Sequence, residues 1–390
     1  MKTYIELVIR EFKLFWSNSV LRMLFIGAPL AYGILFGFVY QKGKVTDLPI
    51  VVVDEDNSPM SQRMIEMLGD NETIKIAAIV PANTDLHSLS IKYNAACVVM
   101  IPDRFEADIL YKRYPEIPVY VNTDNILTAN FASKAIQIVT GTLKAGVQME
   151  ALRKTGVPEE LLMSQYEPFQ VTYIKNYNTS GNYMYFLWPG MLATIFQQVL
   201  FLALALTFSA ELESGTFNEL VKKSRTSLMA IVAKCTPYFI MSFVIWICYA
   251  LMHLYFKVPL GYNLGWLTLI AGLLVFSVSM IGILVSILIP NQLKATEILM
   301  VIATPSFVLS GFTWPLSQMP VWVQYLAQVI PLTHFLEAYR TATIQNGGFD
   351  ALISPVTKMF VLGLVAGIIA WICIEVKFRK AKKGELQITR

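Results

Sequence analysis

Acidic side chains gather at two places in this 390-residue chain where they could do chemistry. The first is Asp54-Glu55-Asp56, directly after the apolar run 49–53. Three carboxylates so close together could hold a cation. A turn at the end of a strand explains them better, because aspartates bond nearby backbone groups in turns. No nucleophile stands beside a base, and the sequence predicts no catalytic residue and no metal site.

The second acidic group belongs to a polar stretch, residues 211–227, which separates two long apolar runs. Residues 184–210 before it carry no charge, and residues 235–256 after it contain only His253 among the basic and acidic types. The whole chain is 55% hydrophobic and 15% charged, whereas soluble domains carry roughly 25% charged residues. The sequence therefore predicts an integral membrane protein in which this stretch connects two membrane segments.

The polar stretch itself has the pattern of a short helix. Thr216 and Glu219 form a capping-box pattern, which predicts that the helix begins at Phe217. Gly215 just before them allows a sharp turn. Acidic residues come first and basic residues last, as the helix dipole favours. We expect a structured helix lying across the ends of two membrane helices.

Six apolar runs approach the ~20 residues that a helix needs to cross a bilayer. Pro305 is expected to kink the fifth of them. The spans are expected over 23–40, 184–210, 228–254, 264–290, 296–312 and 356–376. The fold class is therefore an α-helical polytopic membrane protein. Its expected domains are residues 1–20 (interfacial helix), 21–40 (first span), 41–183 (polar domain) and 184–390 (five-helix membrane region).

Residues 2–17 have apolar and charged side chains on opposite faces of a helix. Such a helix lies along the membrane surface with its basic residues toward the headgroups. Its apolar face consists of Ile5, Val8, Ile9, Phe12, Phe15 and Trp16.

Residues 41–183 have the composition of a soluble domain in which strand and helix patterns alternate, so we expect a small α/β domain. Asp103 and Glu106 form another capping-box pattern at the start of a helix. Phe169, Val171 and Tyr173 alternate as a last strand. Earlier strands are expected over 49–53, 74–80, 95–101 and 119–122, and a long helix over 125–152.

Basic residues set the expected orientation. With six spans, those at the N-terminus, in residues 211–227 and in the C-terminal tail fall on one side. The opposite short loops hold only Lys257, Arg340 and Lys358. Both termini and residues 211–227 are therefore expected in the cytoplasm, and residues 41–183 outside.

The segment 313–345 is too apolar for a solvated loop and too often broken by proline for one span. Two short helices re-entering the outer leaflet satisfy both facts, because broken backbone at membrane depth must be buried in protein. Glu337 and Arg340, spaced i, i+3, could pair. A structural pair is favoured over a transport site.

The predicted spans are nearly free of ionisable groups, which argues against a secondary transporter, since ion-driven carriers need such groups near the midplane. Aromatic and amide side chains could instead line a path for an amphipathic molecule, or they could pack the helices. The candidates for the path are Phe196, Gln197, Gln198, Phe201, Phe307 and Phe312.

With these features in place, the chain resembles the permease subunits of type-2 ATP-binding-cassette (ABC) exporters. Within them it is similar to the bacterial multidrug-type subgroup with a large extracytoplasmic domain between spans one and two. The resemblance covers the whole chain and includes the surface helix and the one-plus-five spans. Its motifs are Glu-Leu-Glu-Ser-Gly-Thr-Phe-Asn-Glu-Leu over 211–220 and the Ser-Gly-Phe…Pro…Met-Pro…Pro-Leu-Thr-His-Phe-Leu-Glu-Ala-Tyr-Arg segment over 310–340. The family often has Glu-Arg-Glu where this chain has Glu-Leu-Glu, so nothing is carried over to Leu212.

The resemblance implies a transport subunit of the bacterial inner membrane that is not itself an enzyme. Two permeases, identical or paralogous, would enclose a path above separate ABC ATPase subunits, which hold the ATP and Mg²⁺; this chain would bind no cofactor. The chain has no phosphate-binding loop of the G-x-x-x-x-G-K-[ST] kind, in agreement with that division. Residues near the ATPase would be Glu211, Glu213, Gly215, Thr216 and Glu219.

The resemblance also implies an outer gate, formed by Gly311, Pro315, Glu337 and Arg340, and allows a periplasmic adaptor as a further partner. The expected cargo is an amphipathic small molecule or a lipid-like substrate. No nucleic-acid partner is expected. The alternative is a membrane receptor or scaffold whose outer domain binds a partner, although this leaves the helix in residues 211–227 unexplained.

Overall fold

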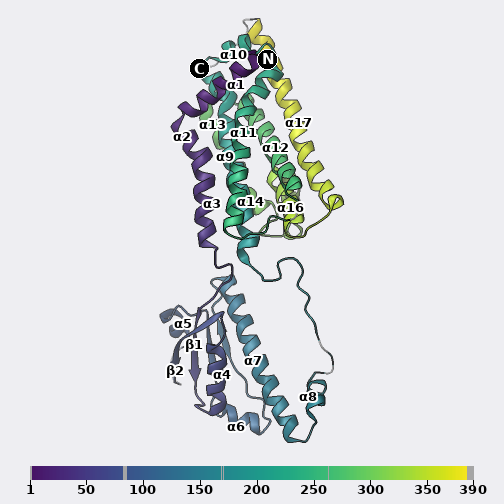
Figure 1. The fold of residues 1–390 in the computed structure, drawn as a ribbon. Coiled ribbons are helices and arrows are strands. Elements are labelled where there is room, and N and C mark those ends of the chain that lie inside the picture. Colours follow the sequence, from purple (N-terminus) through teal and green to yellow (C-terminus); the bar gives the residue numbers. More distant parts are fainter. Residues whose placement is uncertain (1, 82–85, 168, 170, 262, 384–390) are drawn as a thin grey trace. The chain divides into compact units, whose positions relative to one another are not determined.

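The computed structural model describes residues 2–81, 86–167, 169, 171–261 and 263–383, without the side chains of Leu86 and His87 (Figure 1). It forms two compact units. The membrane unit comprises Met1–Gly43 and Lys175–Arg390, and the sheet unit comprises Lys44–Ile174.

The membrane unit holds six helices that are long and apolar enough to cross a membrane, among the residues described. They coincide with the six predicted runs to within a few residues at most ends, and the last begins seven residues earlier. The first is continuous from α2 (Ser19–Arg22) through the π-helix η1 (Met23–Gly27) to α3 (Ala28–Val39). The others are α9 (Tyr183–Glu213), α11 (Ser227–Tyr255), α12 (Leu264–Leu288), α13 with α14 (Gln292–Ala303 and Ser306–Leu309) and α17 (Phe349–Lys382).

Helix α12 lies at the centre of this unit and contacts α9, α11, α13, α16 and α17. The fifth span is interrupted at Pro305, as expected, because proline cannot donate the next helix hydrogen bond. The first and second spans are joined near the start of α9, where Trp188 Nε1 donates to the carbonyl of Gly33 at 2.9 Å.

Short helices cover both ends of the bundle. Helix α1 (Lys2–Ser17), α10 (Phe217–Ser224) and the last turns of α17 lie together at one end, hereafter the α10 end (Figure 1). Between the fifth and sixth spans come the 3₁₀ turn η2 (Leu316–Gln318), α15 (Val321–Gln328) and α16 (Pro331–Thr343). Two short helices were predicted in this segment, and α15 and α16 occupy it.

The sheet unit is built on four strands in the order β2-β1-β3-β4. Strand β1 (Leu48–Asp54) is parallel to β2 (Ile74–Val80) and β3 (Cys97–Ile101), and β4 (Val119–Val121) is antiparallel to β3. Alternate residues of β1 face opposite sides. Ile50 and Val52 pack with α4 (Pro59–Gly69) and α7 (Ile126–Lys154), while Val51 and Val53 pack with α5 (Leu86–Lys92). The remaining helices of the unit are α6 (Phe105–Leu110) and α8 (Glu159–Tyr166).

The acidic residues after β1 form a turn. The carboxylate of Asp54 accepts from the backbone N–H groups of Asp56 and Asn57 at 3.2 and 3.1 Å and from the hydroxyl of Ser61 at 2.9 Å. Asp56 in turn accepts from the N–H of Glu106 in the first turn of α6 at 3.0 Å. The turn interpretation of these carboxylates therefore agrees with the structure.

Two local predictions in this unit are wrong. Arg104, at a positive φ of 61°, precedes α6 without a side-chain cap, so the Asp103–Glu106 capping box is not formed. The carboxylate of Asp56, in the turn after β1, accepts the N–H of Glu106 at this helix end instead. Residues 171–176 form no strand, and Val171 and Tyr173 are exposed; their alternation finds no neighbouring strand with which to pair. Residues 168 and 170 of that prediction lie outside the described residues.

Candidate functional site

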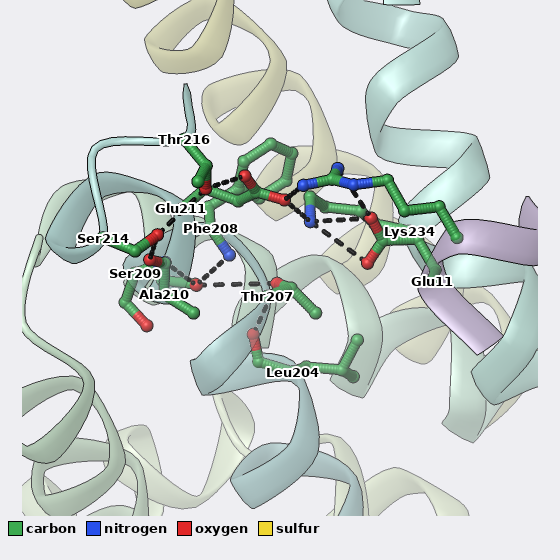
Figure 2. A network of polar contacts seen from close by, with 12 residues as sticks. Glu11, Leu204, Thr207, Phe208, Ser209, Ala210, Glu211, Ser214, Thr216 and Lys234 are labelled. Carbon is green, nitrogen blue, oxygen red and sulfur yellow. Dashed lines mark hydrogen bonds and ion pairs between the residues drawn. The ribbon is translucent and has the colours of Figure 1, made fainter. Parts of the chain in front are cut away.

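Four charged side chains from three helices meet at the α10 end, and we call them the charge cluster: Arg10, Glu11, Glu211 and Lys234. Figure 2 labels the last three of them. Lys234 Nζ lies 3.1 Å from both carboxylate oxygens of Glu11 and 3.1 Å from Oε1 of Glu211. Arg10 Nη2 lies 2.7 Å from the same oxygen of Glu211. One ammonium group therefore joins α1, α9 and α11.

The cluster is almost completely removed from solvent. The exposed fractions of the side chains are 1% for Lys234, 4% for Glu211 and 7% for Glu11, whereas Arg10 keeps 25%. Buried ions are stable only when each is paired, since an unpaired one costs several kcal/mol. Two cations face two carboxylates here, so the charges balance. Lys234 Nζ also lies 5.3 Å from the centre of the Phe208 ring, a favourable cation–π contact.

Helix α1 packs on the bundle along one face. Its buried residues are Leu7, Glu11 and Phe15, spaced by four. Phe15 makes edge-on ring contacts with Phe25 and Tyr238. Phe15 belongs to the predicted apolar set, and Val8 and Phe12 of that set pack against the same core. Glu11 lies on this face, where it pairs with Lys234. That the helix lies along the membrane surface stays a prediction. Ile5, Ile9 and Trp16 of the predicted set are left about half exposed.

Thr216 connects the cluster to α10. Its hydroxyl donates to Oε2 of Glu211 at 2.5 Å. Thr216 precedes α10, which begins at Phe217 as predicted, but it makes no side-chain cap bond, and Glu219 is exposed. The predicted capping box is therefore wrong: the backbone of Thr216, at φ −83° and ψ 1°, is not in the extended conformation that an N-cap residue adopts.

Glu213 and Gly215 lie outside the cluster. Glu213, the last residue of α9, accepts from the backbone N–H and the side-chain amide of Gln292, each at 3.0 Å, at the start of α13. It thus ties the second span to the fifth. Gly215 has a φ of +77° and open space around its Cα. This positive φ agrees with the sharp turn that was predicted at Gly215.

Helix α10 is held from a further side by α17. The buried ring of Phe217 meets Phe378 edge-on at 5.6 Å. Just beyond α10, Ser227 donates to Glu375 at 2.6 Å, and Lys382 donates to the carbonyl of Arg225 at 3.2 Å. The polar stretch is therefore fixed to three spans and the surface helix, and it offers an exposed face that includes Glu219 and Lys223.

The predicted pair of Glu337 and Arg340 is not formed. Glu337 is exposed. The Arg340 guanidinium lies 4.6 Å from the centre of the Phe312 ring and donates to the Phe312 carbonyl at 3.1 Å. Phe312 stacks on Phe186 at 5.1 Å. The prediction is wrong because Arg340 turns toward these rings, away from the exposed side of α16.

The other two residues of the predicted gate, Gly311 and Pro315, lie close to Phe312 in the sequence. Gly311 has a φ of +76°, and a Cβ there would lie 2.5 Å from Leu316 Cγ. Pro315 is exposed at the start of η2. Gly311 precedes Phe312, one of the stacked rings. Among the described residues, no ring contact or hydrogen bond joins Pro315 to that stack.

A groove of about 550 Å³ runs between the first, second and fifth spans. Of the six candidate path residues, Gln198 and Phe307 line it. Phe196 lines a separate apolar cavity of about 70 Å³. Gln197 is fully buried, with Nε2 3.0 Å from the Ser306 hydroxyl. Phe201 and Phe312 are buried in the helix bundle.

Sequence reasoning missed Arg10, Glu11 and Lys234 as partners. A signal existed for two of them. Glu11 stands four residues after Leu7 and four before Phe15, inside the buried stripe, and Lys234 stands inside the apolar run 228–254. Ionisable groups at such positions are buried and need a partner of opposite charge.

Six apolar helices with a surface helix and a structured connector at one end define a polytopic membrane protein. The chain belongs to the family described as ABC-2 family transporter protein, whose model matches residues 19–372. It is 22% identical over 370 residues to the probable multidrug ABC transporter permease YbhR of Escherichia coli K12, covering 94% of this chain and 96% of that one.

Two further relatives in Escherichia coli K12 agree. The probable multidrug ABC transporter permease YbhS is 25% identical over 279 residues, or 70% of each chain. The inner membrane transport permease YhhJ is 24% identical over 347 residues, or 85% of this chain and 88% of that one. The chain is thus a multi-pass inner-membrane permease subunit of an ABC exporter, and the ATPase is a separate subunit.

Proposed function

We propose that this permease exports an amphipathic small molecule or a lipid-like substrate, and that the charge cluster with α10 couples the movement to ATP hydrolysis. The observation that carries the proposal is the contact of Lys234 with Glu11 and Glu211, which links the surface helix to two spans directly beside α10. A push on α10 reaches α9 through Thr216 and Glu211 and reaches α13 through Glu213. The ATPase dimer would supply that push and shift the permease between two states.

The groove supports the substrate class. Its lining comes from the first, second and fifth spans and contains no charged side chain. Hydroxyl and amide groups of Thr194, Gln198 and Thr304 stand among apolar and aromatic ones. Such a surface suits a largely apolar molecule with a few polar groups.

The topology forms part of the same proposal. The α10 end carries the basic residues of the N-terminus, of α10 and of the last turns of α17, so we place it in the cytoplasm. Residues 41–183, which contain the sheet unit, then form an extracytoplasmic α/β domain. That domain and the segment 313–345 would control the exit or meet a periplasmic adaptor. A second permease, identical or paralogous, would complete the transporter.

The test is to purify the tagged protein from native membranes in mild detergent and to identify what accompanies it. An ABC ATPase should copurify, and its amount should fall at least severalfold when Glu219 and Lys223, on the exposed face of α10, are both changed to residues of opposite charge. Exchanging Lys112 of the sheet unit for glutamate should leave the ATPase bound. If other membrane complexes survive the procedure and no ATPase is found, the receptor or scaffold alternative replaces the exporter.

A further inference from the structure

The hydroxyl of Ser286 on α12 enters the backbone hydrogen bonds of α9. It accepts from the N–H groups of Phe208 and Ser209 at 2.8 and 2.9 Å and donates to the carbonyl of Ala205 at 2.8 Å. In a regular helix these two N–H groups bond to the carbonyls of Leu204 and Ala205. Here the Leu204 carbonyl also accepts the Thr207 hydroxyl at 2.7 Å. The backbone groups of two consecutive helix hydrogen bonds, 208 to 204 and 209 to 205, therefore also bond to side-chain hydroxyls.

Close packing makes this contact possible. Gly282, one turn before Ser286, lies so near α9 that a Cβ there would be 2.7 Å from Leu204 Cβ. Two small residues spaced by four let helix backbones approach closely in a membrane. Ser286 is fully buried, so no water competes for these bonds.

The position of this contact within α9 is informative. The groove is lined by α9 residues from Met191 to Leu202, and the charge cluster begins at Glu211. The shared segment, residues 204–209, lies between the two along α9. Figure 2 shows Leu204, Thr207, Phe208 and Ser209 close to Glu211 and Lys234. Insertion of a side chain into the helix ladder is a recognised cause of bending. Bending a membrane helix otherwise exposes unsatisfied backbone groups, which costs several kcal/mol each.

We propose that residues 204–209 form a hinge in α9 and that Ser286 is its positioning residue. Hydroxyls that already share the backbone bonds let the α10 end of α9 change direction without leaving N–H or C=O groups unpaired. The part of α9 that lines the groove then responds to α10 by rotation about this hinge. The inference rests on the proposed coupling role and specifies where in the second span the movement occurs.

The test compares hydrogen exchange of the complex, purified with its ATPase in nanodiscs, with and without ATP and orthovanadate. In the unaltered protein the peptides covering 204–210 should change their exchange, together with those covering 211–227. Ser286→Ala should lose the change at 204–210, because the freed N–H groups return to the Leu204 and Ala205 carbonyls. Its thermal stability should not fall.

Ser279→Ala is the matched control. Ser279 lies on the same helix, is buried, and its hydroxyl has no hydrogen-bond partner among the described residues, so this variant should behave like the unaltered protein. A Ser286→Ala complex that keeps the full change at 204–210, or a Ser279→Ala complex that loses it equally, overturns the hinge and leaves the coupling role standing.

If Ser286→Ala fails to assemble, the pattern of hydrogen exchange along α9 in the unaltered protein still tests the hinge. A change spread evenly over α9, from 183 to 213, overturns the hinge, whereas a change that begins at 204–209 supports it. If no ATPase accompanies the chain, or if residues 211–227 do not respond to ATP and vanadate, the proposed function fails and the hinge fails with it.

Discussion

The ammonium nitrogen of Lys234 lies 3.1 Å from Oε1 of Glu211, and only 1% and 4% of the two side chains are exposed. This contact joins the third span to the second, and Glu11 extends it to the surface helix. Because each charge is desolvated, each depends on the others for its stability. The cluster therefore acts as one structural element, and removing any member affects all three helices.

Lys234→Met should destabilise the protein by about 3–5 kcal/mol, because it leaves two buried carboxylates with Arg10 as their one cation. Adding Glu11→Gln should restore more than half of the loss, since one carboxylate then faces one guanidinium. Thermal denaturation in a single detergent measures both effects. Glu6→Gln, on the exposed side of the same helix, should leave the midpoint unchanged. Equal midpoints for Lys234→Met and the unaltered protein would contradict the buried pairing.

Glu213→Lys should reduce export without unfolding the protein. The new cation cannot accept from the two N–H donors of Gln292, so α9 no longer holds the start of α13. Accumulation of ethidium, an amphipathic dye, in cells that express the chain with its ATPase would measure export. Glu297→Lys makes the same charge change at an exposed site one turn further along α13 and serves as the control. The tie has no role in transport if both variants export equally well.

Arg340→Lys should destabilise the opposite end of the membrane unit by about 0.5–2 kcal/mol, the range for a partly buried cation–π contact. Lysine keeps the charge but loses the planar stacking on Phe312 and the bond to its carbonyl. Glu337→Gln should have no effect, since Glu337 is exposed and does not pair with Arg340. Thermal denaturation of the two variants decides between the ring stack and the ion pair: a larger effect from Glu337→Gln would favour the ion pair.

Cys97 should resist alkylation in the folded protein at pH 8. Burial in strand β3 raises the pKa of its thiol to about 12, so the reactive thiolate is nearly absent at that pH. Unfolding returns the pKa to its ordinary value near 8.5, and the thiol should then react. Mass spectrometry of the Cys97 peptide after iodoacetamide treatment, with and without denaturant, measures the difference. Equal labelling under both conditions would show that Cys97 is not buried.

The spans could be predicted because each apolar run is a property of its own residues. The same holds for the start of α10 and for Gly215, whose turn needs a positive φ. Thr216 and Arg340 were assigned wrong partners, because spacing rules compare residues of one helix. Their actual partners, Glu211 at the end of α9 and Phe312 before η2, lie outside the helices that the spacing rules considered.

The charge cluster shows the same limit. Glu11 and Lys234 are 223 residues apart in the sequence, and no local pattern relates them. Of the six candidate path residues, only Gln198 and Phe307 line the groove, and its use as a path stays a prediction. Which face of α9 turns toward the groove depends on how α3 and α13 pack against it, and periodicity alone does not specify this for a helix that is apolar on all sides.

Hydrogen bonds join the walls of the groove at both ends of α9 and near its middle. Trp188 fixes α9 to α3 near its first residues, and Glu213 fixes α9 to α13 at its last. Gln197 adds a bond from the middle of α9 to Ser306 of the fifth span. By these hydrogen bonds, α9 is joined to α3 at one end only, whereas it is joined to the fifth span at its middle and at the α10 end. The wall between α3 and α9 is therefore the less restrained side of the groove, and it can open most easily away from Trp188.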